Sequence, residues 1–283
     1  MPFITVGTEN SAPIDLYYED HGSGKPVVLI HGFPFNGATW EKETRALQNA
    51  GYRTITYDRR GNGNSAQPAF GYDYNTFAAD LDVLMTELDL NEVTLIGHSM
   101  GTGEVVRYLG NYGSQRVSRA VLLSPLQPML AKASDNPEGV DRSLFKGFQD
   151  AIIKDRFAYL TSFCDAFFNP DQNMGKRVSE EAYRAHWQIG AMASGKATHD
   201  SVDAWQEDFR PDLPKINIPV LIVQGDQDRV LPYPVTGQRL GPMMPSGTLI
   251  TLKGAPHGIP WTHADEVNKA VLDFMKQPAK ARA

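Results

Sequence analysis

Cysteine is almost absent from this chain of 283 residues, which contains only Cys164. A single thiol cannot form an intramolecular disulfide or a cysteine-based zinc site, and its scarcity fits a reducing compartment. The histidines, aspartates and glutamates also lack the spacing of metal ligands. We therefore expect neither a metal nor a cofactor.

Long apolar runs and basic blocks are missing as well. No segment approaches about 18 consecutive apolar residues, and the N-terminal sequence MPFITVGTEN lacks the basic and apolar regions of a signal peptide. The net charge is −6, and the body of the chain has no Lys/Arg block, so nucleic acid is not an expected partner. These absences predict a cytoplasmic protein without a membrane partner, and they leave a homo-oligomer open.

Strand and helix patterns alternate along the first and last parts of the chain. Such alternation is typical of βαβ units, so we predict an α/β fold with a mostly parallel, doubly wound sheet. The expected strands cover 14–19, 27–30, 53–57, 93–96, 120–123, 219–224 and 248–252. The expected helices cover 40–50, 76–88, the segment after 99, and 262–275 with Thr262 as its N-cap.

Strand patterns disappear between 125 and 214. Helices rich in aromatic residues are expected there, at 144–153, 157–168, 180–193 and 202–209. The simplest interpretation is a helical cap, 125–214, inserted into a core domain formed by 1–124 and 215–283.

The sequence Gly-His-Ser-Met-Gly at 97–101 joins a strand pattern to a helix pattern. In G-x-S-x-G the serine lies on a strained strand-to-helix turn, where side chains in place of the two glycines would collide with the neighbouring strand and helix. The N-terminus of the following helix favours negative charge at this point. The pattern predicts Ser99 as a nucleophile; an ordinary glycine-rich turn with an unreactive serine is the alternative.

A serine hydroxyl needs a histidine to accept its proton and a carboxylate to orient that histidine. Of the seven histidines, His257 lies in a Gly/Pro-rich loop between the last strand and the last helix. Asp228 follows the preceding strand and is the expected acid. Asp226 is the alternative, although we expect it to cap the turn by bonding to the backbone two residues on. The chain order Ser99, Asp228, His257 is the order expected of an α/β-hydrolase.

Backbone N–H groups should meet the negative charge that develops on the substrate oxygen. The expected oxyanion-hole donors are Met100, which follows the nucleophile, and Phe33, because Pro34 has no N–H. His31 and His98 are expected to pack near the site. The other four histidines are expected at a turn, in a cap helix or on the surface of a helix N-terminus: His21, His186, His199 and His263. The paired carboxylates Asp80/Asp82 and Glu180/Glu181 are expected on solvated helix faces.

Eight motifs spread over nearly the whole chain resemble the bacterial cofactor-independent haloperoxidases. They are HGFP at 31–34, YDRRG at 57–61, GYDY at 71–74, TFAADL at 76–81, SMGTGE at 99–104, DNPEG at 135–139, GAPHG at 254–258 and WTHADE at 261–266. This branch of the α/β-hydrolases, also called non-haem chloroperoxidases or perhydrolases, includes aryl esterases and a γ-lactamase. The resemblance implies the triad Ser99, Asp228 and His257, and a cap residue, Trp205, that lines the acyl pocket. His98 departs from the pattern, since many members carry Phe there.

The expected activity is that of a serine hydrolase acting on small carboxylic esters or acids through an acyl-enzyme. Water or hydrogen peroxide would resolve this intermediate, and peroxide would give a peracid that oxidises halide. The alternatives are a γ-lactamase, an amidase or a C–C bond hydrolase on the same triad, and a non-catalytic ligand-binding protein. We expect a small aromatic pocket made from Phe33, Pro34, Met100, Trp205 and Ile259, with Phe145, Phe148 or Phe163 as further candidates.

Overall fold

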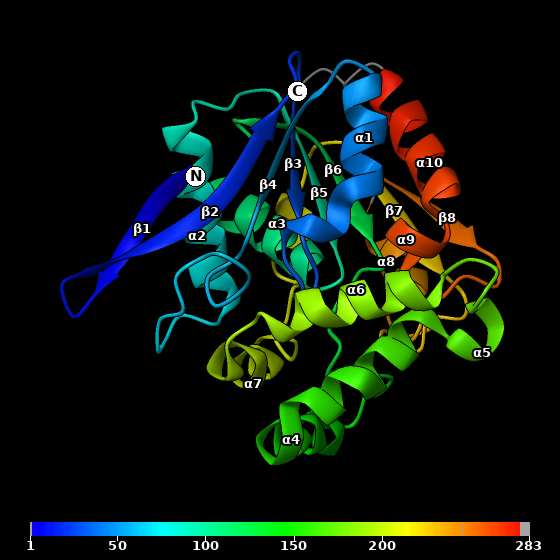
Figure 1. Cartoon of the computed structure of the whole chain (residues 1–283). Helices are drawn as coiled ribbons and strands as arrows, with labels where there is room; N and C mark the ends of the chain where they lie inside the picture. The colour runs from blue at the N-terminus through cyan, green and yellow to red at the C-terminus, as the bar shows by residue number, and fades with distance from the viewer. Residues whose placement is uncertain (1, 245, 278–283) are drawn as a thin grey trace.

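A central sheet of eight strands organises the computed structural model, which describes residues 2–244 and 246–277 (Figure 1). The strands are β1 (Phe3–Glu9), β2 (Ala12–His21), β3 (Pro26–Ile30), β4 (Arg53–Tyr57), β5 (Val93–His98), β6 (Val117–Leu123), β7 (Val220–Gly225) and β8 (Gly247–Leu252). Their order in the sheet is β1-β2-β4-β3-β5-β6-β7-β8. Pairing is antiparallel between β1 and β2 and between β2 and β4, and parallel elsewhere.

Helices lie on both faces of the sheet and beyond one of its ends (Figure 1). They are α1 (Glu41–Asn49), α2 (Tyr74–Glu87), α3 (Met100–Tyr112), α4 (Arg142–Phe168), α5 (Pro170–Asn173), α6 (Glu180–Ala191), α7 (Gly195–Ala204), α8 (Gly237–Met243), α9 (Ile259–Thr262) and α10 (Ala264–Lys276), with 3-10 turns at Gly37–Trp40 and Leu213–Lys215. None of the helices in the described ranges has both the length and the apolar character needed to cross a membrane.

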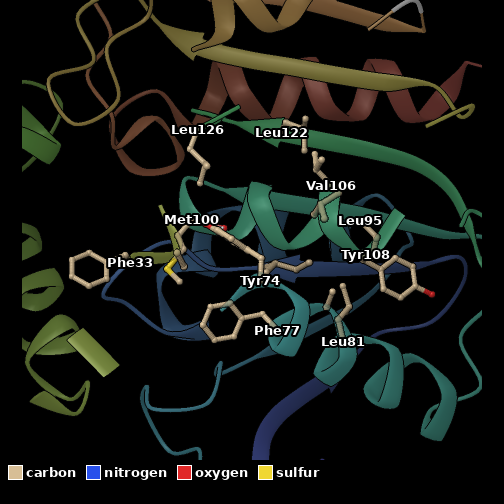
Figure 2. Close-up of a cluster of buried hydrophobic side chains, with 14 of the residues drawn as sticks. Phe33, Tyr74, Phe77, Leu81, Leu95, Met100, Val106, Tyr108, Leu122 and Leu126 are labelled. Atoms are coloured by element: carbon tan, nitrogen blue, oxygen red, sulfur yellow. Dashed lines mark hydrogen bonds between the residues drawn. The ribbon is translucent and has the colours of Figure 1, made fainter. Parts of the chain in front are cut away.

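The sheet divides the hydrophobic core into two layers, because alternate side chains of a strand point to opposite faces. Val27 and Leu29 of β3 belong to the layer under α1 and α10, which lie side by side in Figure 1. Val28 and Ile30 belong to the layer under α2 and α3. Figure 2 shows this second layer, with Phe33 and Met100 at one end and Tyr108 at the other. Burial on both faces explains why the sequence of β3 is a continuous apolar run, as a parallel sheet requires.

The predicted α/β fold with a mostly parallel sheet is confirmed, and β4 has the bounds predicted for it. The two helices predicted at 144–153 and 157–168 correspond to the two halves of α4. The backbone of α4 is non-helical at Asp155, whose side chain accepts bonds from Phe157 N and Ala158 N, both at 3.0 Å. The sequence did not predict β1, which pairs only with β2 at the edge of the sheet.

Two predicted helix positions are wrong. The helix expected at 202–209 is α7, which begins earlier because Ser194 accepts a hydrogen bond from Ala197 N and so caps it. Thr262 is not the N-cap of the last helix, because it is the last residue of α9 and its hydroxyl donates to Gly258 O at 3.0 Å. His263 lies between α9 and α10.

Candidate active site

Ser99 lies at the turn between β5 and α3, in the left-handed region of backbone space with φ 54° and ψ −121°. Its N–H donates to Leu123 O of the neighbouring strand β6 at 2.8 Å. A side chain on Gly97 would place its Cβ 2.6 Å from Gly101 O, and one on Gly101 would collide with Ile30 O. The two glycines are therefore required for the steric reason expected from the sequence, and the turn holds Ser99 in a strained conformation.

Asp228 and His257 are joined by a hydrogen bond of 2.8 Å between Oδ2 and Nδ1, and both side chains are fully buried. The other carboxyl oxygen of Asp228 accepts bonds from Val230 N at 2.9 Å and Leu231 N at 2.8 Å. Gln224 also donates to Oδ2, at 3.2 Å. These bonds fix the carboxyl group, which in turn fixes the imidazole ring. Nε2 of His257 is buried and has no hydrogen-bond partner within residues 2–244 and 246–277.

Asp226 has a different position from Asp228. It accepts a hydrogen bond of 2.7 Å from Gly254 N, at the start of the loop that carries His257. The prediction that Asp226 bonds to the backbone two residues on is wrong. Asp228 makes that bond, to Val230 N, while it also contacts the histidine ring.

The backbone of His257 is held from the side of the nucleophile turn. His98 Nε2 donates to His257 O at 3.1 Å, and Ser124 Oγ donates to the same carbonyl at 3.0 Å. Burial holds the pKa of His98 well below its usual range, so the ring is neutral with its proton on Nε2. The residue before Ser99 thus connects the nucleophile turn to the loop of His257.

A cavity of about 280 Å³ opens beside Ser99, near the small end of the range for ligand pockets. Its walls are mostly apolar side chains. The lining residues are Phe33, Ser99, Met100, Leu126, Leu130, Val140, Leu144, Phe145, Phe148, Tyr159, Ser162, Phe163, Ala166, Trp205, Arg229, Val230, Leu231 and Pro232. Three aromatic rings are in edge contact here, with Phe33 centred 4.6 Å from Trp205 and 5.4 Å from Phe163.

Two residues expected in the pocket do not line it. Ile259 is fully buried in the layer under α1 and α10, because the chain turns into α9 immediately after His257. Pro34 is buried near α6, where a side chain on Gly190 would approach its ring at 3.3 Å. The sequence missed Tyr159, Ser162 and Arg229, three residues with polar side chains that also line the cavity.

The loop that carries Phe33 rests on a buried ionic network. His31 Nε2 accepts a hydrogen bond from Arg59 N, and Arg59 Nη2 donates to His31 O, both at 2.9 Å. Arg59 also pairs with Glu104 of α3 at 2.8 Å, and Glu104 accepts a bond from the hydroxyl of Tyr57. Burial, together with the charge of Arg59, holds the pKa of His31 well below its usual range, which keeps the ring neutral as an acceptor. The network links this loop to β4 and α3.

Three polar side chains for which the sequence suggested no buried contact are buried. Asp80 forms a two-bond ion pair with Arg60, at 2.6 and 2.7 Å. His186 donates from Nδ1 to Ala182 O at 2.9 Å, and burial lowers its pKa to about 4. His263 accepts a bond of 2.9 Å from the hydroxyl of Thr262 or donates to it. The pair Arg59-Arg60, which begins two residues after the end of a buried strand, was the available signal for the Asp80 contact.

No cluster of three or more His, Cys, Asp or Glu residues in the described ranges could hold a metal ion.

Met100 is the first residue of α3, so its N–H has no acceptor within the helix. Both Phe33 and Met100 reach the cavity that contains Ser99. The chemistry available at this site is that of a serine, an imidazole, a carboxyl group and backbone N–H donors.

Comparison with known proteins gives the family of this chain. The model of the alpha/beta hydrolase fold family matches residues 25–264. A protein of Synechocystis sp., provisionally named a non-heme chloroperoxidase, is 57% identical over 98% of this chain and 100% of its own. A bifunctional esterase/perhydrolase of Acinetobacter calcoaceticus is 33% identical over 93% of this chain and 96% of its own. The crystal structure of bromoperoxidase from Bacillus anthracis superposes with a TM-score of 0.92 at 45% identity, covering 98% of this chain and 99% of the other. The chain therefore belongs to the α/β-hydrolase fold family, in the branch of the non-heme haloperoxidases.

Proposed function

We propose that this protein is a serine hydrolase that cleaves small carboxylic esters through an acyl-enzyme on Ser99. The proposal rests on the hydrogen bonding of the two ring nitrogens of His257. Its Nδ1 is bonded to Asp228, while its buried Nε2 has no partner in the described chain and is free to accept a proton. Ser99 lies in a strained conformation at the cavity wall, next to the residue that holds the His257 backbone.

The reaction follows from these positions. His257 Nε2 accepts the proton of Ser99 as Oγ attacks the ester carbonyl, and Asp228 stabilises the imidazolium that forms. The N–H groups of Met100 and Phe33 donate to the oxyanion. His257 then gives its proton to the departing alcohol, which leaves an acyl group on Ser99. A water molecule, deprotonated by His257, releases the carboxylic acid and restores the serine.

Hydrogen peroxide is proposed as a second acceptor of the acyl group. It would attack the acyl-enzyme in place of water and release a peracid, which oxidises halide in solution to hypohalous acid and returns to the carboxylic acid. The name of the Acinetobacter relative pairs esterase with perhydrolase activity, and several relatives are named chloroperoxidases. This route uses the same side chains as ester hydrolysis and requires no redox cofactor.

We also infer that α4 to α7 act as a cap, 125–214, on a core formed by 1–124 and 215–283. These helices lie between β6 and β7 in sequence and contribute Phe145, Tyr159 and Trp205 to the cavity that contains Ser99. The single cysteine is buried and unpaired, which supports a place in the cytoplasm.

The direct test is to detect the acyl-enzyme. Wild-type protein mixed with excess p-nitrophenyl acetate should release nitrophenol in a burst, and acid-quenched protein should gain the mass of one acetyl group on the peptide containing Ser99. Folded protein that turns over this ester without ever carrying an acetyl group on Ser99 would contradict the proposal.

A further inference from the structure

Arg229 is the one residue with a charged side chain among those that line the cavity. It follows the proposed catalytic acid Asp228 directly in the chain. The other polar side chains among the lining residues are uncharged: Ser99, Tyr159 and Ser162 carry hydroxyls, and Trp205 carries an indole N–H. An apolar cavity with one arginine among its lining residues is suited to a ligand that is largely apolar and carries one negative charge.

The guanidinium of Arg229 already holds a carboxylate, which belongs to Asp171 of α5. Nη1 donates to Oδ1 at 2.7 Å and Nη2 donates to Oδ2 at 2.9 Å, the parallel two-bond geometry that arginine uses for carboxylate ligands. Asp171 itself does not line the cavity. The hydrogen bonds that Arg229 donates to Asp171 raise the pKa of Arg229 above its usual value, so the guanidinium stays charged.

This pair is exposed, and only its side chains would have to move for it to separate. The exposed fraction is 44% for the side chain of Arg229 and 57% for that of Asp171, and such surface pairs add little to stability. The backbones on both sides are fixed by other bonds. Asp228 holds Val230 N and Leu231 N, and Asn169 Nδ2 donates to Gln227 O at 2.8 Å. A carboxylate inside the cavity could therefore replace that of Asp171 on Arg229 without displacing the loop.

We propose that Arg229 is a carboxylate-binding subsite, and that the preferred substrates are esters that carry a second, free carboxylate, such as half-esters of dicarboxylic acids. The ester carbonyl binds at Ser99 while the distal carboxylate takes the place of Asp171 on Arg229. The apolar walls between them accommodate the methylene chain that joins the two groups. This inference rests on the proposed esterase function, since it assigns the substrate class of the same site.

The test compares monoethyl with diethyl esters of succinate, glutarate, adipate and suberate, with acid release followed by pH-stat titration at pH 7.5. The quantity measured is the ratio of kcat/KM for the half-ester to kcat/KM for the diester at the best chain length. Asp171→Asn removes the competing carboxylate, so the ratio should rise while the kcat/KM for diesters stays unchanged. Arg229→Gln should lower the ratio by about tenfold, mainly through KM, because a charge-assisted bond to the ground state is lost.

Arg177→Gln is the matched control. Arg177 is a similarly exposed arginine, paired with Glu266 at 2.9 Å and outside the cavity lining, so the same change of charge there should leave the ratio as in wild type. Added KCl should reduce the half-ester preference of wild type and have no such effect on Arg229→Gln.

The two hypotheses fail in different ways. If wild type hydrolyses diesters but the ratio is the same in wild type, Asp171→Asn and Arg229→Gln, the subsite is overturned and the esterase function stands. An equal ratio together with a lower melting temperature in both variants would show that the pair only stabilises the contact between α5 and the loop after β7. If no ester of either kind is hydrolysed by folded wild type, the proposed function itself is wrong.

Discussion

His98 Nε2 donates a hydrogen bond of 3.1 Å to the backbone carbonyl of His257. The two rings are also neighbours, with centroids 5.1 Å apart. Because His98 precedes Ser99, this bond makes the nucleophile turn a direct support for the loop that carries the proposed general base. Ser124 supports the same carbonyl from the end of β6.

Replacing His98 by Phe should remove one of these two supports. We expect kcat for a neutral ester to fall by about three- to tenfold with little change in KM, the effect of losing one buried hydrogen bond that positions His257. Ser124→Ala should have a similar effect, and the double variant a larger one than either. Steady-state kinetics on the four proteins provides the measurement; wild-type kcat in the double variant would show that the carbonyl needs neither donor.

Ser99→Ala and His257→Ala should each lower ester turnover by several orders of magnitude, on the order of 10⁶ by analogy with other serine hydrolases. Neither side chain is needed for the sheet to form, so thermal unfolding should remain cooperative. Turnover measured with p-nitrophenyl acetate, after removal of any wild-type contamination, checks the prediction. Normal turnover in folded Ser99→Ala would end the proposal of an acyl-enzyme at this residue.

Asp228→Asn and Asp226→Asn should differ strongly. Asn at 228 favours the wrong tautomer of His257 and should cost about 10⁴ in kcat, as in a related triad. Asp226 bonds to Gly254 N and has no bond to the imidazole, so its amide variant should lose far less activity. Measuring kcat for both variants against wild type decides the matter, because the reverse ranking would mean that the acid is Asp226.

The fold was predictable because its signals are local, whereas several contacts of the site are not. The apolar run of β3 and the β-branched run of β4 can each be seen within five residues, and both strands were predicted within one residue of their bounds. Arg60 and Asp80 are twenty residues apart in sequence, and only the packing of α2 against the loop after β4 brings them together. The sequence pattern of this helix placed Asp80 on a solvated face. It could not show that the side chain of Arg60 is buried beside Asp80 and pairs with it.

The sequence also did not show in which direction the loops after Asp228 and His257 turn. Ile259 follows the proposed base by two residues and was expected in the pocket, but α9 begins at this residue and turns it into the opposite layer of the core. Arg229 was missed because the strand pattern ends before it, and a charged residue in a loop is usually solvated. Its place at the cavity depends on the turn that Asp228 closes with Val230 and Leu231.

Glu43 should make the protein less stable at neutral pH than in mild acid. Its side chain is buried with Trp40 and Leu47 on one face of the α1 segment, and neither carboxyl oxygen has a partner in the described chain. Burial raises the pKa of Glu43 well above its usual value. At a pH below the pKa that Glu43 has in the unfolded chain, its carboxyl group is protonated in the folded and in the unfolded protein, so ionisation does not affect stability. As the pH rises toward the folded pKa, the unfolded state loses its proton first, so the free energy of unfolding decreases.

Glu43→Leu should therefore raise the free energy of unfolding at pH 7 by about 1–3 kcal/mol, the cost of a buried polar group without partners. The gain should be smaller at pH 4. Glu43→Gln is the control, because it removes the titration but keeps an unpaired polar group. Urea unfolding of the three proteins at both pH values gives the comparison, and a gain for Glu43→Leu that is larger at pH 4 would contradict the assigned pKa direction.

The loop after β3 should govern the reaction with hydrogen peroxide. For a peracid to form, peroxide must compete for the acyl-enzyme with water in vast excess, so the site must offer an acceptor for its distal O–H. Phe33 lines the cavity beside Ser99. The ring of Pro34 fixes its own φ and favours an extended conformation at Phe33, so it governs where the Phe33 carbonyl points. A carbonyl directed at the acyl group can accept that bond.

We expect Pro34→Leu to retain ester hydrolysis and to lose about tenfold in peracid formation, since one hydrogen bond to the attacking peroxide disappears. The assay is bromide-dependent halogenation of monochlorodimedone in acetate and peroxide, run on wild type, Pro34→Leu and Ser99→Ala. Ester turnover of the same preparations controls for a damaged triad. Wild-type activity no higher than that of Ser99→Ala would show that the chain does not form peracid at this serine. Equal activity in Pro34→Leu and wild type would show that the acceptor for peroxide lies elsewhere, because a leucine in place of the proline leaves the direction of the Phe33 carbonyl free to change.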